Sequence, residues 1–597
     1  MYITFVSSLI HYFKVFYGYA GKKLYFLCIV IFLGGICDGL GISMLFPIFN
    51  FESNTEELSV YSQIVYGFLE SVGIGVSLFS LLGLLFVAFF LKGVFYFSQA
   101  SLTSYICTDL AKNLRIGFSK KYAAMSYSYY TNVNIGYLNN IVTVETDKAV
   151  SGLQIYIRII VDIVFVFVYV TAAFIINWKI TFLVLVLSIT MFFALRKLSR
   201  TLRRMSILVT ETNARIQSLL IQLIYNFKYL KATDNFTHLV KTLEKKTDNN
   251  RHYNFKSNVL QAIPSSIVEP VTVLFLSGIM LYHVSYLRQP VSEVMILSVF
   301  FYRTFTRVFG IQDVWQRFNT YFGSIEVINK TTDDLRIHQE TLGSRRLNHF
   351  EKEIFLKGAN FDYEGTPVLF DINLIVPKNR SIGIVGESGA GKTTLFDIIT
   401  GLIIPKSGKV FIDGISYKEL NLLSLRKIVG YVTQEPVIFN DTIANNISFW
   451  ECDMQDLHCR KRIENAAVLA NCDGFISGTK MGYETIIGDK GIKLSGGQCQ
   501  RIAIARELFK KPEIMIFDEA TSSLDTESER IVQESINSMK GQRTTVIIAH
   551  RLSTIRNCDY IYVLNKGRIV EEGEFDELYS DKNSQFYSMC QKQNLYG

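Results

Sequence analysis

The sequence lacks the features that mark several classes of protein. Its nine cysteines are scattered, and it has no Cys-x-x-Cys pair and no cysteine–histidine cluster with zinc-ligand spacing. We therefore expect neither a disulfide framework nor a zinc site. The chain also has no internal repeat at the period of a solenoid and no low-complexity tract, so repeat and compositionally biased architectures are excluded.

The N-terminus lacks a short apolar core followed by a small-residue cleavage site, so we expect no removable signal peptide. We also expect no accessory peptidase domain before the spans, because residues 1–22 are too few to form one. The formal net charge of +8 could indicate a nucleic-acid partner. Basic residues beside membrane spans explain this charge more simply, and we predict no nucleic-acid partner.

Apolar residues are abundant. The chain has 597 residues, more than the roughly 100–200 of a typical domain, so at least two domains are expected. Hydrophobic residues make up 49% of it, which is high for a soluble protein and indicates membrane spans.

Six apolar stretches are long enough to cross about 30 Å of hydrocarbon. They are residues 24–49, 76–99, 155–176, 179–195, 260–283 and 291–310. The connection 51–75 carries glutamates but no lysine or arginine, whereas the long connections 101–154 and 196–256 are basic. The positive-inside rule therefore places both long connections and both termini in the cytoplasm, and we expect a multi-pass protein of the cell inner membrane.

The two long basic connections are too polar to lie in lipid and contain few turn residues. We interpret them as helical extensions of the spans. Each has one break, near residues 129–135 and 224–235, which fits either a short transverse helix or an ordinary loop.

The C-terminal part of the chain has a different pattern. From Glu353, short apolar and often β-branched runs alternate with helical segments, which is typical of an α/β fold. We predict a transmembrane domain over residues 1–322, a linker over 323–352 and a soluble domain over 353–597.

A phosphate-binding loop stands near the start of the soluble domain, between the apolar run 382–385 and a helical segment from Leu395. Its sequence is Gly386-Glu387-Ser388-Gly389-Ala390-Gly391-Lys392-Thr393-Thr394. The glycines let the backbone turn tightly and direct its N–H groups at phosphates, which also lie at a helix N-terminus. Lys392 would reach the outer phosphates and the Thr393 hydroxyl would ligate Mg²⁺, so the chain is predicted to bind a nucleoside triphosphate.

Two acids end a later apolar strand, residues 514–517. Charges at the end of a buried strand are costly unless they face a site. Asp518 suits ligation of Mg²⁺, and Glu519 suits polarisation of the water that attacks the γ-phosphate.

A second candidate anion site follows Leu494. Its residues, Ser495-Gly496-Gly497-Gln498, lead into an apolar helix. One subunit does not need two triphosphate cradles, so one of them is expected to face the nucleotide of a partner.

With these motifs in this order, residues 20–590 resemble the ATP-binding cassette (ABC) family, and in particular an exporter-type half-transporter. The resemblance implies an α-helical six-span membrane domain with long cytoplasmic helical extensions, followed by an α/β P-loop ATPase domain. It also implies a head-to-tail dimer in which each ATP lies between the phosphate loop of one subunit and Ser495–Gln498 of the other.

The same resemblance implies roles for further residues. Tyr363 would stack on adenine, and Gln434 would contact Mg²⁺ and the attacking water. Asp525 would lie across the dimer interface, and His550 would contact the γ-phosphate. Because Glu519 and His550 are both present, a homodimer with two working sites is favoured over a heterodimer with a degenerate one.

The sequence departs from the usual pattern of the family in three places: at Ser523, at Glu507 and at the Asp489-Lys490 pair. The first two changes are interpreted as neutral. The pair lies where the family contacts its coupling helices, so it is expected to adjust coupling without abolishing it.

Charged residues inside the predicted spans need a reason, because each costs about 2.5–3.5 kcal/mol on insertion scales. Arg158 and Asp162 are four apart on one helix face and either pair with each other or serve function. Arg303 and Arg307 are also four apart, with no acid between them; they either bind a phosphate or pyrophosphate headgroup or bond to neighbouring helices. Further candidates without an assigned role are Asp38 and Lys92.

Short features of the spans are similar to bacterial lipid-linked oligosaccharide flippases. They are residues 42–47, the external connection, and Arg303 with Arg307 in the sixth span. We therefore predict ATP-driven movement of a lipid-linked pyrophosphate saccharide. Three alternatives stay open: export of another lipid, drug or peptide; an ATP-gated channel or regulator; and a soluble cassette ATPase acting on DNA, which would have no fused spans.

Overall fold

The computed structural model describes residues 5–51, 60–176, 178–282, 291–363, 365–488, 494–520, 524–549 and 551–594. The chain divides into two compact units. The first comprises residues 1–124 and 133–337, and the second comprises residues 125–132 and 338–597.

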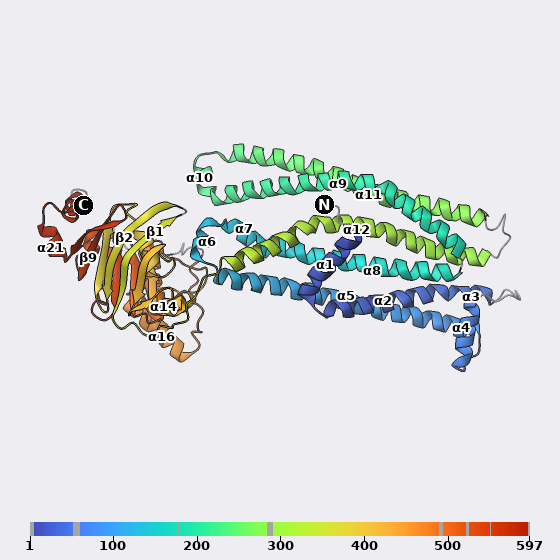
Figure 1. The fold of residues 1–597 in the computed structure, drawn as a ribbon, viewed down its shortest axis with the longest axis horizontal. Helices are drawn as coiled ribbons and strands as arrows, with labels where there is room; N and C mark the ends of the chain where they lie inside the picture. Colours follow the sequence, from blue (N-terminus) through green and yellow to red (C-terminus); the bar gives the residue numbers. More distant parts are fainter. Residues whose placement is uncertain are drawn as a thin grey trace. The chain divides into compact units, whose positions relative to one another are not determined.

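The first unit is built from helices, several of which are very long (Figure 1). Their bounds are α1 Phe5–Ala20, α2 Lys23–Ser43, α3 Leu45–Asn50, α4 Val60–Ser71, α5 Leu78–Ala123, α7 Ile135–Asn140, a π-helical turn Ile141–Glu145, α8 Thr146–Ile176, α9 Trp178–Tyr225, α10 Phe227–Ala232, α11 Phe236–Tyr282 and α12 Val291–Ile337.

Predicted spans and polar extensions form single helices. Helix α5 has 46 residues, which at 1.5 Å per residue is about 69 Å, more than twice the hydrocarbon thickness. It begins at a capping box in which the Ser77 hydroxyl accepts a hydrogen bond from the Ser80 amide. Helix α12 likewise continues to Ile337, into the segment expected to be the linker.

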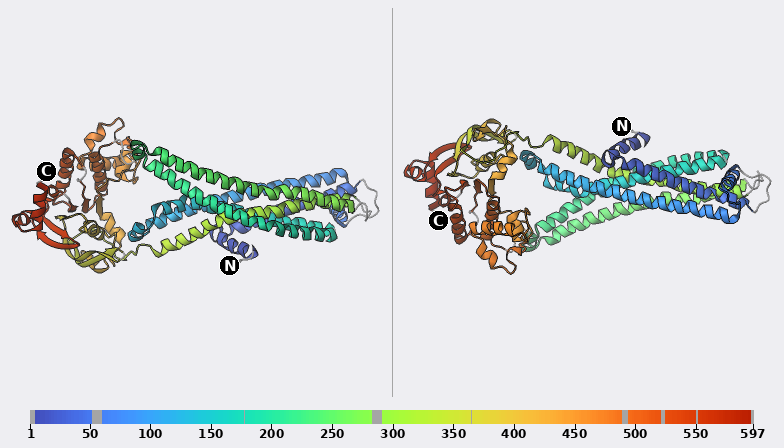
Figure 2. Two further views of the ribbon diagram at one scale, coloured as in Figure 1. Left: turned by 90° about the horizontal axis from the view of Figure 1, so that it is seen from above. Right: turned by 90° about the horizontal axis from the view of Figure 1, so that it is seen from below.

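Helices distant in sequence pack side by side. α2 lies against α5 and α8, α8 lies against α12, and α9 lies against α11, an arrangement that can be followed in all three views (Figures 1 and 2). Glycines bring α2 close to α8: a Cβ built on Gly39 would stand 2.7 Å from a methyl of Val168. A larger residue at that position would force the two helices apart.

Among the described residues, three segments are long and apolar enough to cross a membrane: Lys23–Ile48, Leu78–Ala123 and Ile135–Ile175. They overlap the first three predicted spans, 24–49, 76–99 and 155–176, to within two residues at each end that was predicted to lie beyond them. The other predicted spans fall on α9, α11 and α12, and the count of six remains a prediction. The connection 283–290 lies outside the described residues.

Both predicted breaks contain short helices, α6 (Tyr127–Asn132) and α10 (Phe227–Ala232). Helix α6 belongs to the second unit. There the Ser126 amide donates to the His338 carbonyl (3.0 Å), and Tyr129 stacks on His338. Tyr127 packs against the core of that unit. The short-helix alternative therefore holds at both breaks.

The described residues of the second unit form two sheets. A four-stranded antiparallel sheet has the order β2–β1–β4–β5, and a six-stranded sheet has the order β10–β9–β3–β8–β7–β6, parallel except at β10. The strands are β1 Glu353–Tyr363, β2 Thr366–Pro377, β3 Ser381–Gly386, β4 Ser407–Ile412, β5 Ile415–Ser416, β6 Val429–Val432, β7 Ile514–Asp518, β8 Thr544–Ile548, β9 Tyr560–Asn565 and β10 Arg568–Gly573. The α/β prediction is confirmed.

Helices cover the parallel sheet, whose strands are buried on both faces. Ile514 and Ile516 of β7 pack into one core, and the alternating Met515 and Phe517 pack into the other. The helices are α13 Lys392–Ile399, α14 Leu422–Ile428, α15 Ile443–Ser448, α16 Leu457–Leu469, α17 Asp473–Ser477, α18 Gly496–Phe509, α19 Thr526–Asn537, α20 Leu552–Ile555, α21 Phe575–Ser580 and α22 Gln585–Asn594.

One disulfide corrects the expectation drawn from the scattered cysteines. Cys452, in the connection between α15 and α16, is bonded to Cys459 of α16, and their Cα atoms are 6.1 Å apart. A spacing of seven residues is not a motif that can be read from sequence. The turn of the chain between the two helices brings the thiols together.

Candidate functional site

The phosphate-binding loop joins β3 to α13 and depends on its glycines. Gly389 and Gly391 have φ angles of +80° and +99°, which favour glycine, and Gly391 is the N-cap of α13. Gly386 has a different requirement, because a Cβ there would stand 2.2 Å from the Leu564 carbonyl oxygen. The loop therefore packs directly on the neighbouring strand β9 while its exposed part, Glu387 to Gly389, stays open.

Lys392 lies under this loop. Its Nζ donates to the carbonyl oxygens of Gly386 (2.8 Å) and Glu387 (3.0 Å), and the side chain is buried. Burial lowers the pKa of Lys392, while the nearby carboxylates of Glu519 and Asp518 act in the opposite direction. The structure thus brings the loop lysine and the two strand-end acids into one electrostatic environment.

The acids reach this environment because of strand order. β3, β8, β7 and β6 are neighbours in parallel, so their carboxyl ends meet at one edge of the sheet. Just past these ends, Gln434 Nε2 donates to Glu519 Oε2 (2.9 Å), and within the last residues of the strands the Tyr431 hydroxyl of β6 donates to Asp518 Oδ2 of β7 (3.4 Å). Glu519 has a φ of +48°, an unusual value for a residue other than glycine. Gln434, Asp518 and Glu519 are thus brought together as expected.

These groups fit a magnesium–triphosphate ligand. Thr393 is exposed at the first turn of α13, whereas Thr394 is buried, so only the Thr393 hydroxyl is presented to solvent beside the loop. Hydroxyl and carboxylate oxygens of Thr393 and Asp518 are the ligand types that Mg²⁺ prefers. When bound, Mg²⁺ would neutralise charge on the phosphates.

Asp397 is a member of this neighbourhood that the sequence patterns missed. It lies in α13 and is 5% exposed. Burial first, and then the negative charge of Asp518, raise its pKa from 3.8 to about 6. No motif points to this residue, because only the packing of α13 beside β7 places the two acids close together.

Replacing Asp397 with asparagine is expected to stabilise the protein near pH 7.5. A carboxyl whose pKa is raised in the folded state contributes full stability below pH 3.8, and this contribution is lost as the pH rises through about 6. Above pH 7, ionisation of the buried Asp397 carboxyl lowers the free energy of unfolding by about 3 kcal/mol, and asparagine avoids this penalty. The unfolding temperature of nucleotide-free protein in EDTA, from pH 4 to pH 8, measures it.

The advantage of D397N over the parent should shrink between pH 6 and pH 4. Asp576→Asn, an exposed residue in the first turn of α21, is the matched control and should show no such pH-dependent gain. A constant difference at all pH values would contradict the assignment of this pKa.

The second candidate anion site is the start of α18. Ser495 and Gln498 form a capping box, in which the Ser495 hydroxyl accepts from the Gln498 amide (3.2 Å) and Gln498 Oε1 accepts from the Ser495 amide (2.9 Å). Gly496 is exposed, whereas Gly497 is buried against Ser528. Within the part of the chain that the structure describes, no hydrogen bond or ion pair joins this helix start to the phosphate loop.

The other predicted site residues lie at the rim or outside the described ranges. Tyr363, at the end of β1, is 39% exposed, and its ring packs edge-on against Phe361 at 4.9 Å. Asp525 is the N-cap of α19 and accepts from the Ser528 amide (3.1 Å), and hydrogen bonds from Ser528 lower its pKa. His550 lies outside the described residues, as do Ser523, Asp489 and Lys490.

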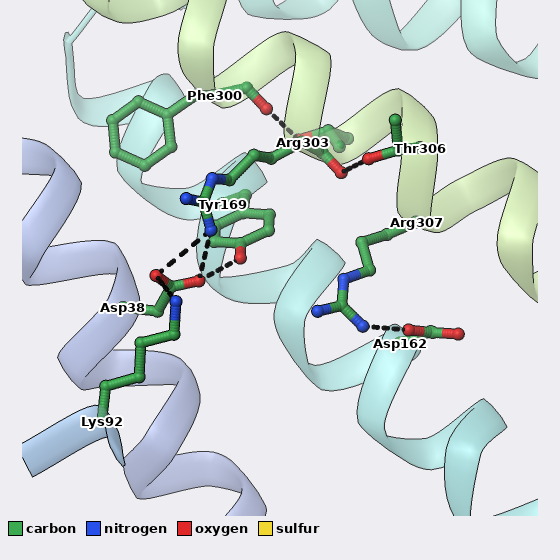
Figure 3. Close-up of polar contacts among 9 residues, drawn as sticks. Asp38, Lys92, Asp162, Tyr169, Phe300, Arg303, Thr306 and Arg307 are labelled. Carbon is green, nitrogen blue, oxygen red and sulfur yellow. Dashed lines mark hydrogen bonds and ion pairs between the residues drawn. The ribbon is translucent and has the colours of Figure 1, made fainter. Parts of the chain in front are cut away.

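A separate cluster of charges lies among the helices of the first unit (Figure 3). Asp38 of α2 is fully buried and receives three donors from three other helices. Lys92 Nζ of α5 is 2.7 Å from Oδ1, Arg303 Nη1 of α12 is 3.1 Å from Oδ2, and the Tyr169 hydroxyl of α8 donates to Oδ2. Asp38 and Lys92, which had no assigned role, thus belong to one network.

Arg307 has its own acid. It pairs with Asp162 of α8 at 2.5 Å, and its guanidinium lies over the Phe165 ring at 4.8 Å. The alternative in which Arg158 and Asp162 neutralise each other is therefore wrong: Arg158 is exposed, and Asp162 faces α12. Arg303 and Arg307 both bond to neighbouring helices, through acids that sequence spacing alone did not reveal.

Together, the fold and these sites define a P-loop ATPase domain joined in one chain to a helical membrane domain. Comparison with known families agrees: residues 28–309 match the ABC transporter transmembrane region, and residues 369–522 match the ABC transporter family. The chain belongs to the ABC transporter family, as a half-transporter whose ATPase activity is coupled to transport. The resemblance drawn from its motifs is confirmed.

Relatives match most of the chain. An ATP-dependent lipid A-core flippase of Syntrophus aciditrophicus is 30% identical over 518 residues, covering 85% of this chain and 84% of its own length. The heterocyst differentiation ATP-binding protein HepA of a Nostoc species is 29% identical, over 83% of this chain and 81% of its own. The structure of a bacterial Atm1-family ABC exporter with ATP bound superposes with a TM-score of 0.76 at 22% identity, covering 96% of this chain and 99% of that one.

Proposed function

We propose that this chain is one half of a homodimeric flippase that uses ATP to move a lipid-linked pyrophosphate saccharide across the inner membrane. The observation that carries the proposal is the group of cations on membrane helices, where Lys92, Arg303 and Arg307 pair with two carboxylates among the described residues. Charges at this depth are costly, and a positive excess fits an anionic headgroup. Relatives named as lipid A-core flippases support a lipid-type substrate.

The cations are placed where a ligand could reach them. The side chains of Arg303 and Arg307 are each 37% exposed, whereas those of Asp38 and Asp162 are 1% and 5% exposed. The carboxylates therefore lie behind the guanidinium groups. Each arginine keeps N–H donors that its acid does not use, and a phosphate could accept them in pairs.

In the proposed cycle, each ATP lies between the phosphate loop of one subunit and Ser495–Gln498 of its partner. Lys392 holds the outer phosphates, and Asp518, Thr393 and Gln434 hold Mg²⁺. Glu519 polarises the attacking water, and His550 holds the γ-phosphate. Tyr363 stacks on adenine, and Asp525 lies across the dimer interface.

Closure of the two ATPase domains on ATP then changes the conformation of the membrane domain. The packing of Tyr127 of α6 on the core of the ATPase unit supports a coupling role for this short helix. We further propose that the long basic connections and both termini are cytoplasmic.

The proposal is tested by ATPase activity of the purified protein in neutral phosphatidylcholine liposomes. Activity is measured with and without a polyprenyl-pyrophosphate-linked saccharide, beside Glu519→Gln as a hydrolysis-deficient control. The lipid should stimulate hydrolysis, and the combined substitution of Arg303 and Arg307 by alanine should abolish the stimulation, because the two guanidinium groups that would bind the pyrophosphate are removed.

Arg317→Ala is the matched control. Arg317 lies on the same helix beyond the predicted span and pairs with Asp313 at 2.7 Å, so its loss should leave the stimulation intact. Hydrolysis that is indifferent to this lipid in the parent protein would retain the ABC transporter and reject the substrate. Export of another lipid, drug or peptide would then take its place.

A further inference from the structure

Asp38 is the one carboxylate of the Figure 3 cluster that two cations share. Its Oδ1 is 2.7 Å from Lys92 Nζ, and its Oδ2 is 3.1 Å from Arg303 Nη1. The Tyr169 hydroxyl, which is neutral, completes the donors to this carboxylate. The group formed by Asp38, Lys92 and Arg303 therefore keeps one positive charge, whereas the pair formed by Asp162 and Arg307 is neutral.

The exposed fractions of the three side chains show which of them a ligand would contact first. The side chain of Asp38 is 1% exposed, and those of Lys92 and Arg303 are 29% and 37% exposed. A ligand thus contacts the two cations first and is repelled by a carboxylate directly behind them. The affinity of this site for an anion therefore depends on the balance between attraction by the two cations and repulsion by the carboxylate.

We infer that Asp38 is a selectivity-determining residue, which lowers the charge of the Lys92–Arg303 site so that it retains a multiply charged pyrophosphate but not the singly charged phosphodiester of ordinary bilayer lipids. The inference rests on the proposed function. Asp38 acts through the two cations and does not itself contact the substrate, so it is a positioning residue for them as well as a counter-charge.

The physical reason is the difference in ligand charge. Attraction between charges a few ångströms apart is strong where the effective dielectric constant is well below that of water. A site with one net positive charge favours a group with two or three negative charges over a group with one. Without Asp38 the site would carry two net positive charges, which is enough to hold an abundant monoanionic lipid. A flippase in a membrane rich in such lipids needs to reject them.

The test compares two lipids on the full-length protein and on Asp38→Asn in neutral nanodiscs. Phosphatidylglycerol is the monoanionic probe, and undecaprenyl pyrophosphate is the multiply charged one. In the parent protein, only the pyrophosphate should stimulate ATP hydrolysis. In D38N, phosphatidylglycerol should also stimulate, and at a concentration at least roughly 10-fold below the highest one that leaves the parent unstimulated.

Two variants separate charge from structure. Asp38→Glu keeps the negative charge and should restore rejection of phosphatidylglycerol. Tyr169→Phe removes a hydrogen bond to Asp38 without changing charge and should also keep the parent selectivity. A newly acquired response cannot come from a protein that has failed to fold, so D38N is informative even if it is less stable.

The outcomes are distinct. If undecaprenyl pyrophosphate stimulates both the parent and D38N, and D38N still ignores phosphatidylglycerol, the inference is overturned and the proposed function stands. If D38E and D38N respond alike, charge is not the cause and the inference fails. If the parent responds to neither lipid, the proposed function itself fails.

Discussion

Replacement of Glu519 by glutamine is expected to lower the turnover of ATP at least 100-fold while ATP still binds. Glu519 lies at the end of β7, where Gln434 Nε2 donates to its carboxylate at 2.9 Å. An amide in its place keeps the size of the side chain but cannot accept a proton from the attacking water. Loss of a general base typically costs 10²–10⁴ in rate. Phosphate release under single-turnover and steady-state conditions measures the change.

The effect should fall on turnover and not on affinity. Binding of a fluorescent ATP analogue should therefore remain within a few-fold of the parent. Glu353→Gln, at the exposed start of β1, removes a carboxylate of the same domain and should leave turnover unchanged. An E519Q protein that retains more than a third of the parent rate would place the catalytic base elsewhere.

Replacement of Lys392 by alanine is expected to remove hydrolysis and to weaken ATP binding about 10- to 100-fold. Its Nζ lies beneath the phosphate loop, 2.8 Å from the Gly386 carbonyl oxygen, and no other lysine of the loop can replace it. A hydrogen bond between charged groups contributes about 1.5–3 kcal/mol, which corresponds to that change in affinity. The ATP-induced rise in unfolding temperature, measured in EDTA to prevent turnover, reports binding directly.

Lys409→Ala is the matched control, because Lys409 is an exposed lysine on β4 of the same unit. Its removal should leave both the thermal shift and hydrolysis at the level of the parent. If K392A kept the full ATP-induced shift, the phosphates would lie away from this loop.

The nucleotide site could be predicted almost entirely because its requirements are local. Gly389 and Gly391 occupy φ angles that favour glycine, and Lys392 lies next to them in the chain. Asp518 and Glu519 follow a buried strand, and parallel strands bring their carboxyl ends together wherever the sheet forms. The membership of Asp397 could not be predicted, because its pKa depends on how closely α13 packs beside β7.

The membrane cluster shows the opposite case. Helical spacing correctly placed Arg303 and Arg307 on one face, but it also suggested that Asp162 pairs with Arg158. The partner of Asp162 is 145 positions away, and the partner of Arg303 is 265 positions away. Pairs of this kind are decided by which helices lie side by side, and local spacing carries no information about that.

By itself the sequence determined that this chain is an ATPase joined to a membrane domain, because short contiguous motifs carry the chemistry of phosphate binding and long apolar runs carry the membrane preference. Only the tertiary structure decided which charges neutralise one another, that Asp38 serves two cations, and that Cys452 bonds to Cys459. Each of these depends on a distance between side chains, and such distances are set by packing of the folded chain.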